Sequence, residues 1–433
     1  MTAALIAFAA LLLLAFARIP IAFAMIIVGV VGFAIERGFE ASLGQFGQVA
    51  FGSGLSYELS VVPLFVLMGN FVTNAKLSED LYRVANAFLG HRRGGLAMAT
   101  VVACGGFASV CGSSMATAAT MAKVAMPSMR KFGYSDSLAT GSIAAGGTLG
   151  ILIPPSVILV IYGILTQTNI GKLFMAGILP GILGVLLYLV AIQWVVRRNP
   201  AAGPPGEKTA WPQRMNALGG VWGVLVLFLV VMVGIYAGAF TPTEAAGVGA
   251  MGAFLFALYR RQLNWRIFFA VLLESAITTA MLFVVLIGAN IFSDYLGQIG
   301  FAEALTDFVQ SIGANRWTII FAIIVIYVIL GCVLESLSMV LLTVPIFYSL
   351  VVDTLKFDPI WFGILVVVVV EISLLTPPVG LNVFVLRGVL PDVPTGVIFR
   401  GVMPFFTVDL VRIAILAAFP IISLWLPSVA NIK

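Results

Sequence analysis

Charged residues are scarce in this sequence: only 9% of its 433 positions hold Asp, Glu, Lys or Arg, whereas 61% are hydrophobic. So little charge excludes a soluble domain and indicates a chain with many membrane spans. The net charge of +5 would suggest a nucleic-acid partner in a soluble protein. Here most basic residues stand in loops and at the ends of apolar segments, so we expect the lipid bilayer as a partner and no nucleic acid.

Cysteine and histidine are equally rare. Cys104, Cys111 and Cys332 lack the even count of a disulfide framework and the spacing of a zinc site, so we expect them to be packing residues. His91 stands beside Arg92 at the end of a span, where it is a topology residue and joins no metal cluster. The sequence also lacks a Gly-x-x-x-x-Gly-Lys-Ser/Thr nucleotide motif, which leaves an ion gradient or another subunit as the energy source.

Two proline pairs interrupt apolar segments that are long enough to cross a bilayer. Pro154-Pro155 follows a glycine-rich run within about 137–165, and Pro377-Pro378 lies within about 359–388. Proline lacks a backbone N–H and clashes with the preceding turn, so each pair predicts a broken transmembrane helix. Unpaired backbone groups at membrane depth are tolerated only beside protein or a water-filled cavity, so each break indicates a ligand site.

Each broken helix has a companion segment with a small polar centre between two apolar arms. The polar tip 113–117 lies within about 94–129, and the tip 336–339 lies within about 317–352. We interpret both segments as re-entrant helical hairpins with tips near the membrane midplane. Hydroxyl and carbonyl oxygens suit Na⁺, and half-helix N-termini suit a carboxylate. Alternatively, such hydroxyls only hydrogen-bond between helices or to their own turn.

The second half of the sequence repeats the order of the first, which indicates a duplication. The amphipathic segments Leu77–Leu89 and 301–310 stand before the two hairpins, as the proline pairs stand after them. The linker 197–216 separates residues 1–196, a first repeat with N-terminal scaffold spans, from residues 217–433, a second repeat with its own scaffold spans. The predicted fold is an all-α polytopic membrane protein with inverted structural repeats, two re-entrant hairpins and two broken transmembrane helices.

Basic residues set the expected orientation. They bracket the first hairpin and flank the linker, which places these loops in the cytoplasm. One further crossing puts the mouth of the second hairpin on the other side, so the repeats are inverted. Counting outward places both termini in the periplasm, if the cell is Gram-negative. Near the N-terminus, the glycine-rich segment 45–60 is expected to be a connection between spans.

Three charged residues stand beside the predicted tips and breaks: Glu335, Glu371 and Lys123. A carboxylate at the centre of a membrane helix costs roughly 2.5–3.5 kcal/mol, so each carboxylate needs a role or a partner. The sequence leaves two readings open for these residues, an ion pair between helices and a role with a cation or a proton.

Four motifs occur in a fixed order along the chain: Cys-Gly-Ser-Ser-Met-Ala-Thr at 111–117, Gly-Thr-Leu-Gly-Ile-Leu-Ile-Pro-Pro-Ser at 147–156, Thr-Pro-Thr-Glu-Ala-Ala at 241–246 and Leu-Thr-Pro-Pro-Val-Gly-Leu-Asn at 375–382. Together they resemble the large membrane (M) subunit of tripartite ATP-independent periplasmic (TRAP) transporters. The similarity spans nearly the whole chain. Cys111 departs from the family pattern, in which we expect a small residue such as serine or glycine.

The resemblance implies a transporter subunit and not an enzyme: a Na⁺ symporter of the bacterial inner membrane that moves an organic anion by an elevator mechanism. The anion would be a carboxylate such as a dicarboxylate, a sugar acid or sialic acid. The implied partners are a small membrane (Q) subunit and a periplasmic substrate-binding (P) protein. The implied ligands are, for the first Na⁺ site, Ser113, Ser114, Gly147, Thr148 and Gly150; for the second, Ser336, Ser338, Met339, Thr376 and Gly380; and for the substrate, Thr117, Ser156 and Asn382.

Two other functions remain to be weighed. A sodium–dicarboxylate transporter that needs no binding protein would share the inverted hairpins, but we would expect Ser-Asn-Thr tips, which neither hairpin carries. A membrane-embedded enzyme would need a nucleophile with a base, or a metal cluster, at membrane depth. His91 offers neither, and only Glu335 and Glu371 keep this possibility open.

Overall fold

The computed structural model describes residues 2–331, 334–377 and 379–430, so Cys332 and Pro378 lie outside the described residues. Within these ranges every regular element is a helix and no strand occurs. The predicted all-helical class is therefore confirmed.

Some of the apolar helices are long enough to cross a bilayer, and others, of 10–17 residues, are shorter. Among the described residues, four helices are long and apolar enough to cross a bilayer, or six if each of two bent helix pairs counts as one span. The four are α10 (Ile170–Arg198), α14 (Trp265–Gln298), α17 (Ser336–Tyr348) continued by η4 (Ser349–Thr354), and α20 (Thr395–Ala418). These lengths are those of a multi-pass membrane protein.

One expectation near the N-terminus was wrong. Residues 45–60 do not form a connection, because α3 (Phe39–Leu55) is a continuous helix that meets the next helical segment, Glu58–Asn74, at 59°. Glycine lowers helix stability by about 1 kcal/mol per residue, but proline is absent from α3 and its other residues tolerate a helix. The bend at Ser56 and Tyr57 takes the place of the expected loop.

The remaining elements follow the expected order. In the first half they are α1 (Thr2–Phe16), α2 (Ile21–Arg37), η1 (Glu58–Ser60), α4 (Val61–Asn74), α5 (Leu77–Leu89), α6 (Gly95–Cys111), α7 (Ser114–Lys131), α8 (Asp136–Thr148), η2 (Leu149–Ile151) and α9 (Val157–Thr166). In the second half they are η3 (Pro200–Ala202), α11 (Trp211–Leu218), α12 (Trp222–Tyr236), α13 (Pro242–Tyr259), α15 (Phe301–Ile312), α16 (Arg316–Gly331), α18 (Pro359–Ser373), α19 (Leu381–Val389) and α21 (Ile421–Val429).

Side-chain caps explain several of the helix starts. At α13, Thr241 Oγ1 accepts a hydrogen bond from the Glu244 amide at 3.2 Å, while the Thr241 amide donates to Glu244 Oε2 at 2.8 Å. This reciprocal pair satisfies two amides that the helix leaves unpaired. Ser135, Asn169 and Asn264 cap α8, α10 and α14 in the simpler one-bond form.

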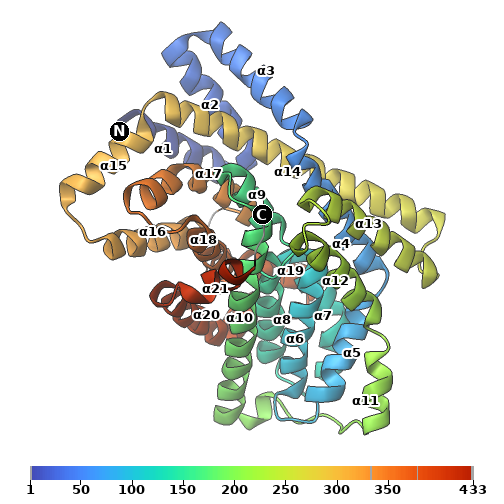
Figure 1. The fold of residues 1–433 in the computed structure, drawn as a ribbon. Coiled ribbons are helices and arrows are strands. Elements are labelled where there is room, and N and C mark those ends of the chain that lie inside the picture. The colour runs from blue at the N-terminus through green and yellow to red at the C-terminus, as the bar shows by residue number, and fades with distance from the viewer. Residues whose placement is uncertain (1, 332–333, 378, 431–433) are drawn as a thin grey trace.

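The helices form two packed groups (Figure 1). In one group α14 packs against α2 and α4, and α4 packs against α13. In the other group α6, α7 and α8 pack on one another, and α8 packs against α20 from the other half of the chain. The last contact is very close, because a Cβ atom on Gly401 would lie 1.9 Å from the Ser137 carbonyl oxygen. The buried hydrophobic residues form two clusters, and each cluster contains residues from both halves of the chain.

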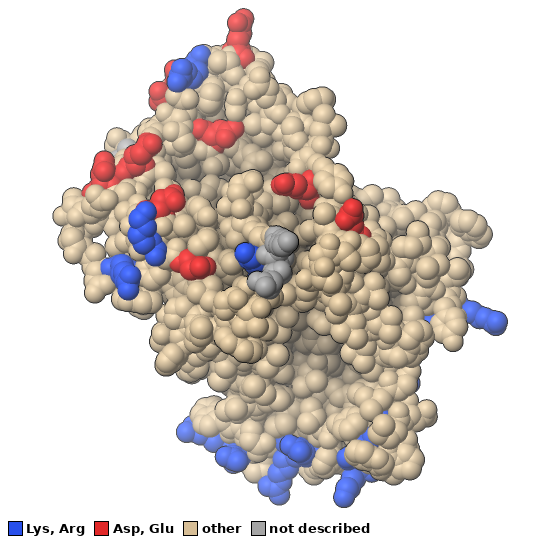
Figure 2. All heavy atoms as spheres, viewed as in Figure 1, with Lys and Arg blue, Asp and Glu red and all other residues tan. Residues whose placement is uncertain are grey.

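Charge is unevenly distributed over the face shown in Figure 2. Lys and Arg lie along the lower edge, where Figure 1 places α11 and the lower ends of α5 and α10, and the Asp and Glu in view lie on the upper part together with several Lys and Arg. Most of the surface between the two ends is uncharged, apart from a basic side chain that projects at the right. A largely uncharged zone bounded by charge matches a bilayer-spanning protein.

Candidate functional site

The first hairpin turns sharply at its tip. Helix α6 ends at Cys111, Gly112 adopts a left-handed conformation with φ of +63°, and α7 begins at Ser114. Ser113 Oγ accepts a hydrogen bond from the Ala116 amide at 3.4 Å and so caps α7. The C-terminus of one half-helix and the N-terminus of another thus meet at the tip, which brings partial charges of both signs together.

The first broken helix lies directly against this tip. Helix α8 and η2 end at Ile151, and α9 starts again at Val157, capped by Ser156. A Cβ atom on Gly147 would lie 3.1 Å from the Ser114 carbonyl oxygen, and one on Gly150 would lie 3.1 Å from that of Ser113. The glycines therefore let two stretches of backbone approach each other closely. This contact brings together four of the five residues predicted for the first Na⁺ site. The fifth, Thr148, stands between the two glycines in sequence, and its hydroxyl donates to the Ala145 carbonyl at 2.8 Å.

The second hairpin has the same outline but a charged cap. Helix α16 ends at Gly331 and α17 begins at Ser336. The Glu335 carboxylate accepts hydrogen bonds from the amide and the hydroxyl of Ser338, at 3.3 and 3.2 Å. Met339 is fully buried, and its carbonyl accepts a hydrogen bond from Thr343. The second tip therefore carries a carboxylate where the first has a serine.

The second break lies against the arm of that hairpin. Helix α18 ends at Ser373, Thr376 Oγ1 donates to the Ile372 carbonyl at 2.8 Å, and Gly380 (φ of +57°) precedes α19. A Cβ atom on Gly331 would lie 2.0 Å from the Ser373 Cβ, so α16 and α18 are in tight contact. Thr376 and Gly380 thus stand at the break, as predicted, while the three tip residues of the second site belong to α17.

A cavity of about 200 Å³ lies between the two tips. The first tip contributes Ser113 and Ser114, the second contributes Glu335 and Ser336, and the first break contributes Ile151 and Val157. The remaining walls come from α4 and α14, including Asn70, Glu274 and Thr278. The structure therefore brings the two predicted tips to one cavity beside the other group of helices.

The three residues predicted to bind substrate lie outside this cavity in the structure. Thr117, Ser156 and Asn382 are all fully buried. Thr117 Oγ1 donates to the Ser113 carbonyl at 2.7 Å, and Asn382 Nδ2 donates to the Ala144 carbonyl of α8 at 3.1 Å. Ser156 Oγ donates to the Ile151 carbonyl. Each side chain therefore supports the tip or the break from behind.

Other cavity residues were missed by sequence reasoning. Asn70 Nδ2 donates to Ser275 Oγ at 2.8 Å, joining α4 to α14. Glu274 stands in an apolar helix and lines the cavity with Thr278. A single carboxylate inside a long apolar segment was the available signal for Glu274.

The remaining charged candidates, Glu371, Lys123 and His91, lie in different surroundings. Glu371 forms an ion pair with Arg412 of α20 at 2.8 Å, and both side chains are fully buried. Lys123 lies on an exposed face of α7. His91 lies in the loop between α5 and α6, where desolvation and then the charge of Arg214 lower its pKa. Of the two readings left open for Glu371, the interhelical ion pair is therefore present.

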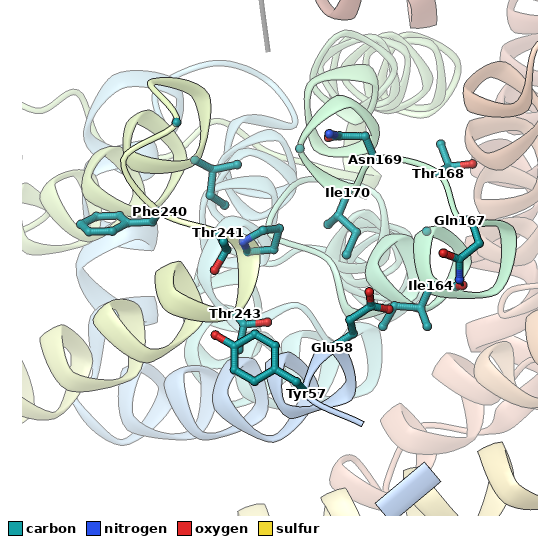
Figure 3. A pocket seen from close by; sticks show the side chains of 15 residues that line it. Tyr57, Glu58, Ile164, Gln167, Thr168, Asn169, Ile170, Phe240, Thr241 and Thr243 are labelled. Atoms are coloured by element: carbon teal, nitrogen blue, oxygen red, sulfur yellow. The ribbon is translucent and has the colours of Figure 1, made fainter. Parts of the chain in front are cut away.

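A larger cavity of about 660 Å³ lies beyond the tips. It is lined by the α3–α4 bend, the α9–α10 turn and the α12–α13 turn, and Figure 3 shows Glu58, Gln167 and Thr241 among its walls. These turns include the N-terminal end of α10, a helix whose 29 residues reach the basic linker at the other end. Such a helix is about 43 Å long, longer than the roughly 30 Å hydrocarbon core of a bilayer, and the cavity and the linker lie at its opposite ends.

Comparisons with known proteins agree along the whole chain. Residues 8–422 match the family described as "Tripartite ATP-independent periplasmic transporter, DctM component". The C4-dicarboxylate TRAP transporter large permease protein DctM of Pseudomonas aeruginosa is 38% identical over 374 residues, which cover 86% of each chain. The sialic acid TRAP transporter large permease protein SiaM of Vibrio cholerae is 31% identical over 96% of each chain. The ectoine TRAP transporter large permease protein TeaC of Halomonas elongata is 31% identical over 97% of each.

Solved structures show the same kind of fold. The YdaH transporter of Alcanivorax borkumensis aligns with a TM-score of 0.60 at 13% identity, covering 88% of this chain and 89% of that one. MtrF of Neisseria gonorrhoeae aligns with a TM-score of 0.59 at 12% identity, covering 91% and 85%. The family match over residues 8–422 and the 38% identity to a large permease protein decide the family of this chain. The chain is a transporter subunit of the inner membrane and not an enzyme, and it belongs to the DctM component family of tripartite ATP-independent periplasmic transporters.

Proposed function

We propose that the chain takes up a small organic anion together with Na⁺ after a periplasmic binding protein has delivered the anion. The cavity between the two hairpin tips carries this proposal, because it joins serine hydroxyls, helix ends and a carboxylate in one space. Members of this family work with a periplasmic binding protein and usually with a small membrane subunit. We expect both partners here.

Two contacts support the Na⁺ sites. At the first, Gly147 and Gly150 let the carbonyl oxygens of Ser113 and Ser114 approach the first break closely, and the helical segment α8–η2 ends at Ile151, where the C-terminal end carries partial negative charge. At the second, the Glu335 carboxylate stands beside Ser336 and Ser338, with Met339 behind them and Thr376 and Gly380 at the neighbouring break. Oxygen ligands of this kind suit a hard cation.

The substrate is proposed to lie between the tips. Helices α7 and α17 begin there, and their N-termini offer amides and positive partial charge to a carboxylate. Thr117, Ser156 and Asn382 shape this region by holding the tip and the breaks, and we propose that they face the substrate in another state of the transport cycle. The related proteins are named for C4-dicarboxylates, sialic acid and ectoine, so the class is a small organic acid or zwitterion.

An elevator movement fits the two helix groups. Residues 1–196 and 217–433 act as inverted repeats joined by the linker 197–216. The hairpins and broken helices form the mobile part, and α4, α13 and α14 form the scaffold. The amphipathic helices α5 and α15 connect the two parts as arms. The basic lower edge in Figure 2 faces the cytoplasm, and both termini face the periplasm.

The Na⁺ gradient is large enough for this task. One positive charge moving down about 100 mV gains roughly 2.3 kcal/mol. Two Na⁺ ions that enter with a monoanion move one net charge, so the electrical part alone supports roughly fiftyfold accumulation. The concentration gradient of Na⁺ adds to it.

Reconstituted uptake tests the proposal. The chain with its small subunit is placed in proteoliposomes, and substrate-loaded binding protein is added outside. Uptake should require Na⁺ and should stop when K⁺ or choline replaces it. Undiminished uptake without Na⁺ would rule out the coupling, and uptake of free substrate without binding protein would favour the simpler anion transporter.

A further inference from the structure

Five fully buried polar side chains form a continuous chain through the protein. They come from four helices: Thr148 from α8, Tyr188 from α10, Asp409 and Arg412 from α20, and Glu371 from α18. Only Thr148 belongs to the candidate Na⁺ sites. None of the five side chains lines the cavity between the tips.

The contacts run in one line. Glu371 Oε2 lies 2.8 Å from Arg412 Nη1, which lies 3.3 Å from Asp409 Oδ1. Tyr188 donates its hydroxyl proton to Asp409 Oδ2 at 2.7 Å. The Tyr188 and Thr148 hydroxyl oxygens are 3.3 Å apart. The line thus leads from the last turn of the second broken helix to the end of the first.

The Asp409 carboxylate orients the hydroxyl protons of Tyr188 and Thr148. An ionised carboxylate only accepts, so it takes the single proton of Tyr188, and the Tyr188 oxygen is left as an acceptor. Thr148 then donates to Tyr188 or to the Ala145 carbonyl, which is 2.8 Å away. Among the described residues, no other group donates to Thr148 Oγ1. Its lone pairs are therefore free for a cation.

The charges of Glu371, Asp409 and Arg412 also favour a cation beside Thr148. With both carboxylates ionised, two carboxylates and one guanidinium leave a surplus of one negative charge, and all three groups are shielded from water. A surplus charge in the interior is costly unless an opposite charge lies nearby. A cation bound beside Thr148 supplies that charge, and the C-terminal end of α8 favours it further.

We propose that Tyr188, Asp409, Arg412 and Glu371 are positioning residues for the first cation site: they orient the Thr148 hydroxyl and supply the charge that attracts Na⁺. This inference rests on the proposed Na⁺ coupling. Glu371 also precedes Ile372, whose carbonyl accepts the Thr376 hydroxyl of the second candidate site.

Conservative variants test the chain. Asp409→Asn removes the surplus charge and leaves the Glu371–Arg412 pair balanced. It also lets an amide donate to the Tyr188 oxygen, which turns the Tyr188 proton toward Thr148. The Na⁺ concentration for half-maximal uptake should rise about tenfold in Asp409→Asn and about threefold in Tyr188→Phe, and the latter is expected for the loss of one hydrogen bond. Uptake at saturating Na⁺ and the KM for substrate-loaded binding protein should stay near wild type. A purely structural role would not change the Na⁺ requirement alone.

Tyr162→Phe is the matched control, because its hydroxyl is also buried and donates to the Pro359 carbonyl at 2.6 Å. It should leave the Na⁺ requirement unchanged. If wild-type uptake needs no Na⁺, the proposed function itself fails. If wild type needs Na⁺ but folded Asp409→Asn and Tyr188→Phe keep the wild-type half-saturation, only the positioning role is overturned. Should Asp409→Asn fail to fold, Tyr188→Phe decides by the same criterion, with the Na⁺-dependent rise in Tm of the detergent-solubilised protein as a second readout.

Discussion

The two halves of the molecule bury different kinds of polar groups around similar helix breaks. The polar side chains at the first tip and the first break are all neutral, and they include Ser113, Ser114 and Thr148. The second half carries Glu335 at its tip and buries Glu371, Asp409 and Arg412 behind its break. The two halves therefore have helix breaks in corresponding places, while the charged groups around the breaks are concentrated in the second half. The neutral site of the first half depends on charges that the second half supplies.

Removing Arg412 should break this arrangement most severely. Arg412→Gln leaves Glu371 and Asp409 buried without a counter-charge, and such a change costs about 3–5 kcal/mol. We expect a large fall in the Tm of the purified protein. The double variant Glu371→Gln/Arg412→Gln should recover part of it, because it removes one of the two carboxylates.

Arg83→Gln is the control for this loss. Arg83 also pairs with a carboxylate, that of Asp80, but its side chain is 67% exposed. Exposed pairs contribute about 0–1 kcal/mol, so its Tm should barely move. An Arg412→Gln protein as stable as Arg83→Gln would show that the buried charges of the second half are not balanced by Arg412.

The contact between the first tip and its break should be the next most sensitive feature. In Gly147→Ala the new methyl group would lie 2.9 Å from Ala118 Cβ and 3.1 Å from the Ser114 carbonyl oxygen. Overpacking of this kind costs about 1–3 kcal/mol, and here it pushes apart the oxygens proposed to hold Na⁺. Na⁺-dependent uptake should fall at least about tenfold while the protein remains folded. Gly44→Ala, which meets nothing within 4 Å, should transport like wild type.

The two amphipathic helices sharpen the comparison between the halves. In α5, Asp80 accepts hydrogen bonds from Arg260, at the end of α13, and from Arg83. In α15 only Phe301 is buried among the residues of that helix. Asp80→Asn should cost about 1–2 kcal/mol, since it weakens charged hydrogen bonds in a mostly buried place. Glu303→Gln on α15 should cost less than about 0.5 kcal/mol, as surface changes do. Equal shifts in Tm would mean that the first arm is not anchored by Asp80.

Local signals in the sequence were enough to locate the tips and the breaks, because proline and glycine act on the turn in which they stand. Pro154 and Pro377, and the glycines before Pro154, predicted where helices end, and the structure ends them there. The buried chain from Glu371 to Thr148 was not predicted, because its members are distant in sequence and each has several possible partners. Segment 45–60 was misread because several weak glycine effects were counted as one strong break.

The smallest predicted effect separates the two tips directly. Ser338 Oγ donates to Glu335, and when Ser338→Ala removes this bond the carboxylate keeps the Ser338 amide and gains a free lone pair for a cation. The first tip contains no carboxylate that could take over from Ser114. Ser114→Ala should therefore raise the Na⁺ concentration for half-maximal uptake about fivefold, and Ser338→Ala about twofold, within the range of one hydrogen bond. Ser311→Ala, which removes an exposed hydroxyl of α15, is the control. If both tip variants lose folded protein in proportion to uptake, these hydroxyls serve helix packing, and the difference between the halves does not extend to cation binding.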